Sequence, residues 1–179
     1  MKLIAITRPF IIENEDFLIR ELFDNGFDIL HLRKPDADIE YCRSLLKSLS
    51  KDERRRIIIH DHHKLINEFD LKGLHFNKHV SVVPKDYKGF RTRSCHSFEE
   101  VKKYKDDYDY VFLSPIFDSI SKVGYNSAFS DKMLREASNK GIIDEKVVAL
   151  GGVTFEKIPY LKELNFGGVA MLGNIKSQF

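Results

Sequence analysis

Short apolar runs alternate with amphipathic stretches along almost the whole chain, and this alternation is the strongest constraint on its fold. Most of the apolar runs are continuous, as expected of parallel strands that are buried on both faces. Repeated strand–helix alternation predicts an α/β fold with a parallel sheet, and eight strands favour closure into a (β/α)8 TIM barrel. The expected strands are Leu3–Thr7, Phe27–Arg33, Arg56–His60, Gly73–Phe76, Phe90–Cys95, Tyr110–Ser114, Val147–Gly151 and Gly168–Leu172.

Helical patterns separate several of these strands. Residues 18–23 carry an apolar stripe, and Ser97 and Glu100 have the spacing of a capping box at the start of another helix. A further stripe at helical spacing consists of Cys42, Leu45, Leu46 and Leu49.

Two regions depart from the barrel pattern. Residues 77–89 show little helical period and contain Pro84, so we expect the fourth helix to be short or absent. The chain also ends soon after the eighth strand, so we expect little or no closing C-terminal helix. An open doubly wound sheet is the alternative fold, and its ligands would also bind at the carboxyl ends of the strands.

Length and composition narrow the functional class. At 179 residues, the chain is expected to form a single domain, residues 1–179. A net charge of +2 gives no indication of nucleic-acid or membrane partners, and two cysteines argue against a disulfide framework. No segment is long enough to span a bilayer or resembles a signal peptide, so the cytoplasm is the expected location. The oligomeric state is left open.

Glycines mark the ends of the last two expected strands. Gly151 and Gly152 end the seventh strand, and Gly173 and Asn174 follow the eighth. Glycine allows a ligand to approach the backbone, and phosphate commonly binds after strands seven and eight of a barrel. These four residues are therefore predicted to bind phosphate.

Histidines and cations gather where the other strands end. Six of the seven histidines lie in or next to these ends, namely His31, His60, His62, His63, His75 and His96. The cations Arg33, Lys34, Lys78 and Lys122 form a set suited to a phosphorylated substrate.

Individual residues in this group admit different roles. His31 can be either a packed barrel residue or a ligand contact, whereas Arg33 favours anion binding. Asp61 can hold Mg²⁺ through oxygen and water ligands. Neighbouring histidines at 60–63 would point in opposite directions, so a histidine-bound metal is not expected there. His96 is the best candidate for proton transfer near neutral pH.

Seven segments, in the same order, resemble thiamin phosphate synthase and its TenI relatives, and the resemblance covers nearly the whole chain. The segments are HLRKP (31–35), IIIHDHHKL (57–65), GLHF (73–76), SCHSFEE (94–100), DYDYVFLSPIFDSISK (107–122), VALGGVT (148–154) and GGVAMLGNI (167–175).

The resemblance implies a thiamin-biosynthesis barrel that binds a phosphorylated thiazole. It assigns catalytic roles to His96 and Lys122 and phosphate binding to the two glycine loops, and it makes Asp61 a Mg²⁺ ligand. The residues that it implies for substrate binding are His31, Arg33, His60, Ser94, Ser119 and Ser121.

Departures from the family pattern affect the expected reaction. A family lysine falls on Pro35, and the second Mg²⁺ aspartate falls on Val80. These losses favour a thiazole tautomerase in which His96 shuttles the proton and no cofactor is needed. The alternative is the synthase, in which aminopyrimidine diphosphate ionises, the thiazole nitrogen captures the cation and Mg²⁺ assists the departing pyrophosphate. A third reading is a non-catalytic regulatory paralogue that binds a thiamin-related phosphate.

Overall fold

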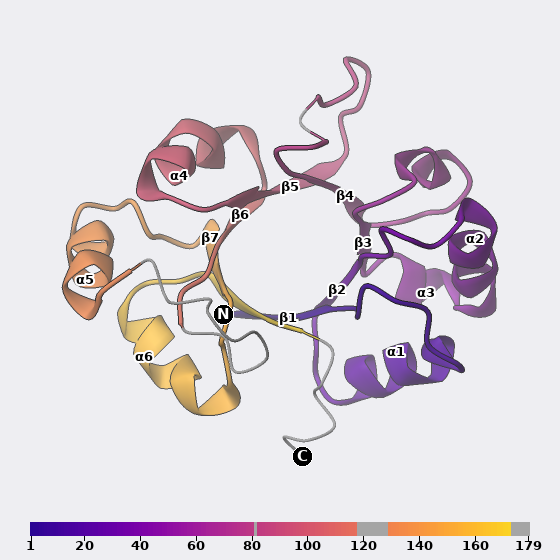
Figure 1. Cartoon of the computed structure of the whole chain (residues 1–179), viewed down its shortest axis with the longest axis horizontal. Helices are drawn as coiled ribbons and strands as arrows, with labels where there is room; N and C mark the ends of the chain where they lie inside the picture. The colour runs from indigo at the N-terminus through magenta and orange to yellow at the C-terminus, as the bar shows by residue number, and fades with distance from the viewer. Residues whose placement is uncertain (81, 118–128, 173–179) are drawn as a thin grey trace.

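Eight parallel strands close into a barrel in the computed structural model, which describes residues 1–80, 82–117 and 129–172 (Figure 1). The strands follow one another in chain order around the barrel, and β8 pairs with β1 to close it. Their bounds are β1 Lys2–Ile6, β2 Ile29–Leu32, β3 Ile57–Ile59, β4 Gly73–Phe76, β5 Phe90–Cys95, β6 Tyr110–Leu113, β7 Val147–Leu150 and β8 Gly168–Leu172. The predicted barrel is confirmed, and the open sheet is wrong.

Helices surround the barrel (Figure 1). They are α1 Glu15–Asp24, α2 Ile39–Ser48, α3 Lys51–Arg54, α4 Phe98–Tyr104, α5 Asp131–Asn139 and α6 Ile158–Glu163, with the short 3₁₀ helices η1 His63–Asn67, η2 Lys105–Asp107 and η3 Phe155–Lys157. The predicted stripe at Cys42, Leu45 and Leu46 is the buried face of α2, and the Asp38 carboxylate caps that helix by accepting from Tyr41 N. In the described residues, no helix is long and apolar enough to cross a membrane.

The connection from β4 to β5 carries no helix in its described residues, 77–80 and 82–89, as the sequence predicts. It runs outward past the ring of helices (Figure 1). Its first turn is closed by the Asn77 side-chain oxygen, which accepts from the backbone N–H groups of His79 and Val80. The predicted lack of a closing helix concerns residues 173–179, which lie outside the described residues.

Two cores stabilise the fold. The larger one lies between the outer face of the barrel and the helices, whereas the smaller one fills the barrel itself. The inward-facing apolar residues are Ile4, Ile6, Ile29, Ile58, Tyr110, Phe112, Val148 and Ala170. Toward the carboxyl ends of β2 to β5 the interior becomes polar, and the residues buried there include His31, His60, His75 and Thr92. The polarity of the barrel therefore rises toward one end.

Gly73 is a point where the barrel has no room for a side chain. A Cβ atom at this position would lie 2.0 Å from the backbone oxygen of Phe90 on the neighbouring strand. We expect Gly73→Ala to destabilise the protein by about 3 kcal/mol, because the β4–β5 ladder would have to move apart. Denaturant unfolding measures this change.

Gly26 supplies the control for this substitution. Its φ of +87° is unfavourable for alanine, but a Cβ there would meet no atom within 4 Å. Gly26→Ala should therefore cost only about 1–2 kcal/mol. Equal losses for the two variants would contradict the steric explanation.

Candidate active site

The polar end of the barrel interior is built by the alternation of side chains along β2 to β5. His31 follows the inward-facing Ile29 by two residues, and His60 follows Ile58 in the same way. Side chains two apart on a strand share a face, so both imidazoles point into the barrel. Barrel chemistry occurs at the carboxyl ends of the strands, which is where these rings lie.

A cavity of about 980 Å³ lies at the opposite end of the barrel. Its lining includes Lys2, Asp28 and Lys72, which stand at or before the starts of their strands, and Gly167, which precedes β8. Because catalytic groups of barrels come from the other end, this cavity is not the candidate active site.

His31, His60 and Tyr110 form one hydrogen-bonded chain inside the barrel. His31 Nδ1 lies 2.7 Å from His60 Nε2, and His31 Nε2 lies 2.5 Å from the Tyr110 hydroxyl. His31 has no exposed surface and His60 retains only 7%. The predicted substrate contact of His31 would therefore act through His60, which lies nearer the barrel end.

His75 belongs to a second, adjoining set of hydrogen bonds. Its Nδ1 lies 2.8 Å from Thr92 Oγ1, and its Nε2 lies 2.8 Å from Ser94 Oγ. Its ring stacks on that of His60, with centroids 4.0 Å apart. The sequence prediction included Ser94 but missed Thr92 and Tyr110, although period-two alternation along β5 and β6 would have placed both side chains inside the barrel.

Burial keeps the three imidazoles neutral. Loss of hydration lowers the pKa of His75 to about 3, and it lowers the pKa values of His31 and His60 well below their usual range. Repulsion from His75 lowers the pKa values of His31 and His60 further, and repulsion from His31 adds to the effect on His60. The end of the barrel therefore offers hydrogen-bonding groups without added positive charge.

The three histidines do not form a metal centre in this arrangement, although their ring nitrogens lie within 4.8 Å of one another. A metal ion bound to an imidazole lies in the plane of the ring, about 2.0–2.1 Å from the nitrogen for zinc. The rings of His60 and His75 are stacked and only 15° from parallel, so no point at bonding distance lies in both planes. Both nitrogens of His31 and of His75 already have hydrogen-bond partners.

Arg33 follows β2 at this end of the barrel and its side chain is exposed. The Thr7 hydroxyl accepts from Arg33 N at 2.9 Å and donates to Arg33 O at 3.1 Å, which fixes the Arg33 backbone against the end of β1. The guanidinium makes no ion pair with any carboxylate in the described part of the chain. This arrangement suits the anion binding predicted from the sequence.

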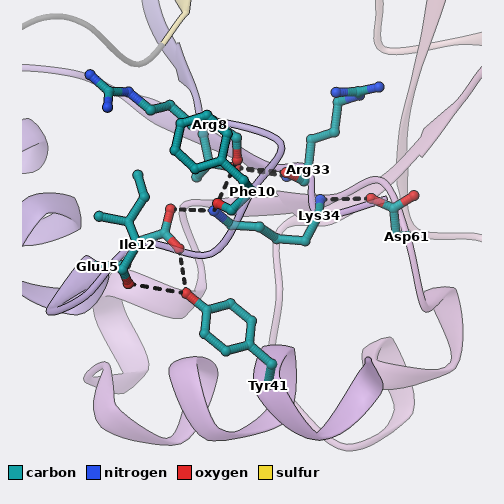
Figure 2. Close-up of polar contacts among 9 residues, drawn as sticks. Arg8, Phe10, Ile12, Glu15, Arg33, Lys34, Tyr41 and Asp61 are labelled. Carbon is teal, nitrogen blue, oxygen red and sulfur yellow. Dashed lines mark hydrogen bonds and ion pairs between the residues drawn. The ribbon is translucent and has the colours of Figure 1, made fainter. Parts of the chain in front are cut away.

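Lys34 does not belong to the predicted cationic set. Its side chain is fully buried, and its ammonium donates to Glu15 Oε1 at 2.6 Å and to the carbonyls of Arg8 and Phe10. Figure 2 shows this side chain turned toward Glu15, away from Arg33 and Asp61. Tyr41 donates to the other Glu15 oxygen at 2.7 Å. Lys34 therefore anchors the β1–α1 loop and contributes no free charge.

Asp61, the predicted Mg²⁺ ligand, follows β3 beside Arg33. One carboxylate oxygen, Oδ2, accepts from Lys34 N at 2.8 Å (Figure 2), and this bond orients the group. Val80 stands where the family has its second Mg²⁺ aspartate, and Asp86 is a carboxylate in the same β4–β5 connection. Both residues are exposed in this connection, which runs outward. A single carboxylate fits Mg²⁺ only if phosphate oxygens and water complete the coordination shell.

His96 follows β5 and its ring is exposed. His96 Nδ1 lies 3.1 Å from the Ser114 carbonyl, which only accepts, and 3.3 Å from the Ser114 hydroxyl, which can accept or donate. Glu100 accepts from His96 N at 2.6 Å, while Ser97 Oγ accepts from Glu100 N at 3.1 Å. The predicted capping box is thus half formed, and its carboxylate holds His96. In the tautomer that donates from Nδ1 to the Ser114 carbonyl, Nε2 is a proton acceptor.

The predicted glycine loop after β7 adopts a conformation that requires glycine. Gly151 and Gly152 have φ angles of +94° and +60°, and a Cβ on Gly151 would lie 2.8 Å from Pro115 Cα. Phe117 N donates to Gly151 O at 3.1 Å, which joins this loop to the one after β6. The N–H groups of the two glycines have no acceptor in the described ranges, as a phosphate-binding loop requires.

The remaining predicted site residues lie outside the described residues. They are Ser119, Ser121 and Lys122 in the loop after β6, and Gly173 and Asn174 after β8.

The buried Lys34–Glu15 pair leads to a stability prediction. We expect Lys34→Met to destabilise the protein by about 3–5 kcal/mol, because Glu15 would keep its buried charge without a cation. The double variant Lys34→Met/Glu15→Gln should recover part of this loss, since glutamine is neutral and still accepts from Tyr41. Chemical denaturation measures both values, and a loss below about 1 kcal/mol in the single variant would contradict the assignment.

The neutral imidazoles predict a loss of stability in acid. Below pH 6.5, the ordinary pKa of a histidine in water, the unfolded chain takes up protons that His31, His60 and His75 do not accept in the folded state. The free energy of unfolding should therefore fall as pH is lowered, by up to about 1.4 kcal/mol per pH unit for each histidine. Urea titrations between pH 7 and 5 measure the slope. His75→Gln should reduce this slope by the contribution of one histidine. A free energy of unfolding that does not change with pH in the unmodified protein would refute the neutral network.

A family model described as thiamine monophosphate synthase matches residues 3–175. Among curated relatives, the thiamine-phosphate synthase of Phocaeicola vulgatus is 27% identical over 175 residues, covering 87% of this chain and 81% of the relative. The putative thiamine-phosphate synthase 2 of Aquifex aeolicus is 29% identical over 169 residues, covering 87% and 88%.

Solved structures agree with these matches. Thiamine phosphate pyrophosphorylase from Bacteroides thetaiotaomicron superposes with a TM-score of 0.89 and 43% identity, over 100% of this chain and 86% of the other. Thiamine phosphate pyrophosphorylase from Pyrococcus furiosus superposes with a TM-score of 0.74 and 19% identity, over 96% of this chain and 85% of the other. At this identity the match supports the fold alone. Because the family model matches almost the whole chain, this protein belongs to the thiamin phosphate synthase/TenI family.

Proposed function

We propose that this protein is a thiamin phosphate synthase, which joins aminopyrimidine diphosphate to thiazole phosphate and releases pyrophosphate. The observation that carries the proposal is that Arg33 and Asp61 both lie at the carboxyl ends of adjacent strands, β2 and β3. Arg33 has no carboxylate partner in the described part of the chain, and Asp61 is oriented by Lys34 N. The names of the curated relatives support the synthase over the tautomerase expected from the sequence.

The reaction can be divided between the two groups of residues. The carbon–oxygen bond to the diphosphate breaks, its electron pair leaves with pyrophosphate, and the thiazole nitrogen forms the new carbon–nitrogen bond. Arg33 would bind the departing oxygens, where negative charge develops. Mg²⁺ held by Asp61 and the diphosphate would neutralise part of the same charge.

The imidazole network suits the other half of this reaction. Ionisation places positive charge on the aminopyrimidine fragment, and an imidazolium beside it would raise the barrier. His31, His60 and His75 remain neutral because they are buried. The network can therefore bind the heterocycle through hydrogen bonds without opposing the developing cation.

The Gly151–Gly152 loop would bind the thiazole phosphate. Its two glycines have positive φ angles, and their N–H groups, which have no acceptor in the described ranges, provide backbone donors for an anion. The corresponding roles of Gly173 and Asn174, and of Ser119, Ser121 and Lys122, remain predictions from the sequence.

Thiazole tautomerase is the second candidate, and the orientation of His96 favours it. Donation from Nδ1 to the Ser114 carbonyl leaves Nε2 free to take a proton from a substrate carbon. Neither of the two curated relatives is described as a tautomerase, so this reaction ranks below the synthase.

Incubation with both synthase substrates and Mg²⁺ tests the proposal. We expect pyrophosphate release that requires both substrates, and we expect Asp61→Asn to reduce its rate by about 10²-fold or more through lost charge stabilisation. Asp86→Asn is the matched control, because Asp86 is exposed in the outward β4–β5 connection and its loss should leave the rate unchanged.

Two further measurements separate the alternatives. Without diphosphate, calorimetric titration should show no tight Mg²⁺ site, since Asp61 alone supplies one carboxylate. Isomerisation of the thiazole without pyrophosphate release, abolished by His96→Ala, would establish the tautomerase instead. Ligand binding with neither reaction would identify a regulatory paralogue.

A further inference from the structure

The hydrogen-bonded chain inside the barrel has a direction, and Tyr110 sets it. The Tyr110 side chain is 1% exposed, and its hydroxyl has His31 Nε2 as its one partner in the described residues. If His31 donated this bond, the hydroxyl proton would be buried without an acceptor, at a cost of about 1–3 kcal/mol. Donation from Tyr110 to His31 Nε2 avoids that cost.

The direction of this first bond determines the next one. A neutral imidazole carries one proton, so His31 with an unprotonated Nε2 must carry it on Nδ1. His31 Nδ1 then donates to His60 Nε2, 2.7 Å away. Because His60 Nε2 accepts this bond, it has no proton, and the proton of the His60 ring must lie on Nδ1.

His60 Nδ1 is the free end of the chain. It has no hydrogen-bond partner among residues 1–80, 82–117 and 129–172, and His60 keeps a small exposed area at the end of β3. Asp61, the next residue, stands in the candidate active site. The proton on His60 Nδ1 is therefore available to a molecule bound there.

We infer that Tyr110 is a positioning residue that acts through His31 to fix His60 as a hydrogen-bond donor in the active site. The site would accordingly select a ligand with an acceptor atom at this place, such as an unprotonated ring nitrogen of a heterocycle. The identity of that ligand rests on the proposed function, whereas the proton order of the chain does not.

Nitrogen NMR of the histidine-labelled protein at neutral pH tests the proton order without any substrate. We expect His31 and His60 to show protonated Nδ1 and unprotonated Nε2, opposite to the tautomer that free histidine favours. Tyr110→Phe keeps the ring but removes the donor, so the two histidines should change to the other tautomer or to a mixture. Tyr108→Phe is the control, because the Tyr108 hydroxyl contacts Arg93 and, among the described residues, no histidine.

Calorimetric binding of aminopyrimidine diphosphate tests the consequence. Tyr110→Phe should weaken binding about five- to tenfold, the effect of one lost hydrogen bond, while Tyr108→Phe should leave it unchanged. A protonated Nε2 on His60 in the unmodified protein would overturn the inference, as would weaker binding of the Tyr110 variant without a change of tautomer. If the unmodified protein does not bind this compound, the proposed function fails, and the NMR result still decides the proton order.

Discussion

The polar end of the barrel is stable because its hydrogen-bonding side chains are buried with partners and without a charge. Inside the barrel, His31, His60 and His75 find their partners in one another and in the hydroxyls of Tyr110, Thr92 and Ser94. An unpaired polar group or an imidazolium in this space would be costly. The network meets the requirement by sharing neutral donors and acceptors among side chains from β2 to β6.

Among the described residues, the charged groups of the site lie at its edge, where the strands give way to loops. Arg33 and Asp61 flank Lys34, whose backbone orients Asp61 while its side chain holds the β1–α1 loop. Asp61 directly follows the buried His60, and the exposed Arg33 stands two residues after the buried His31. This division matches a reaction in which a heterocycle gains positive charge as a diphosphate leaves.

Much of the fold could be predicted from the sequence because buried parallel strands appear as continuous apolar runs. Gly73–Phe76 and Phe90–Cys95 were predicted with their observed bounds. Lys34 was predicted to belong to the cationic set, but its side chain is buried. It follows the end of β2, where alternation no longer fixes the direction of a long side chain. Tyr110 was missed because it stands in an apolar run, and only closure of the barrel brings its hydroxyl across the interior to His31. The expected reaction relied on local family motifs, which give no such contacts.

The environment of Lys34 limits which residues evolution can place at this position. Its ammonium directs three protons toward three acceptors, the carbonyls of Arg8 and Phe10 and the Glu15 carboxylate. A guanidinium is larger and planar, and it holds its five N–H groups in a fixed fork that does not match this arrangement. Arginine, the exchange usually regarded as mild for lysine, would therefore be excluded here for reasons of shape rather than charge.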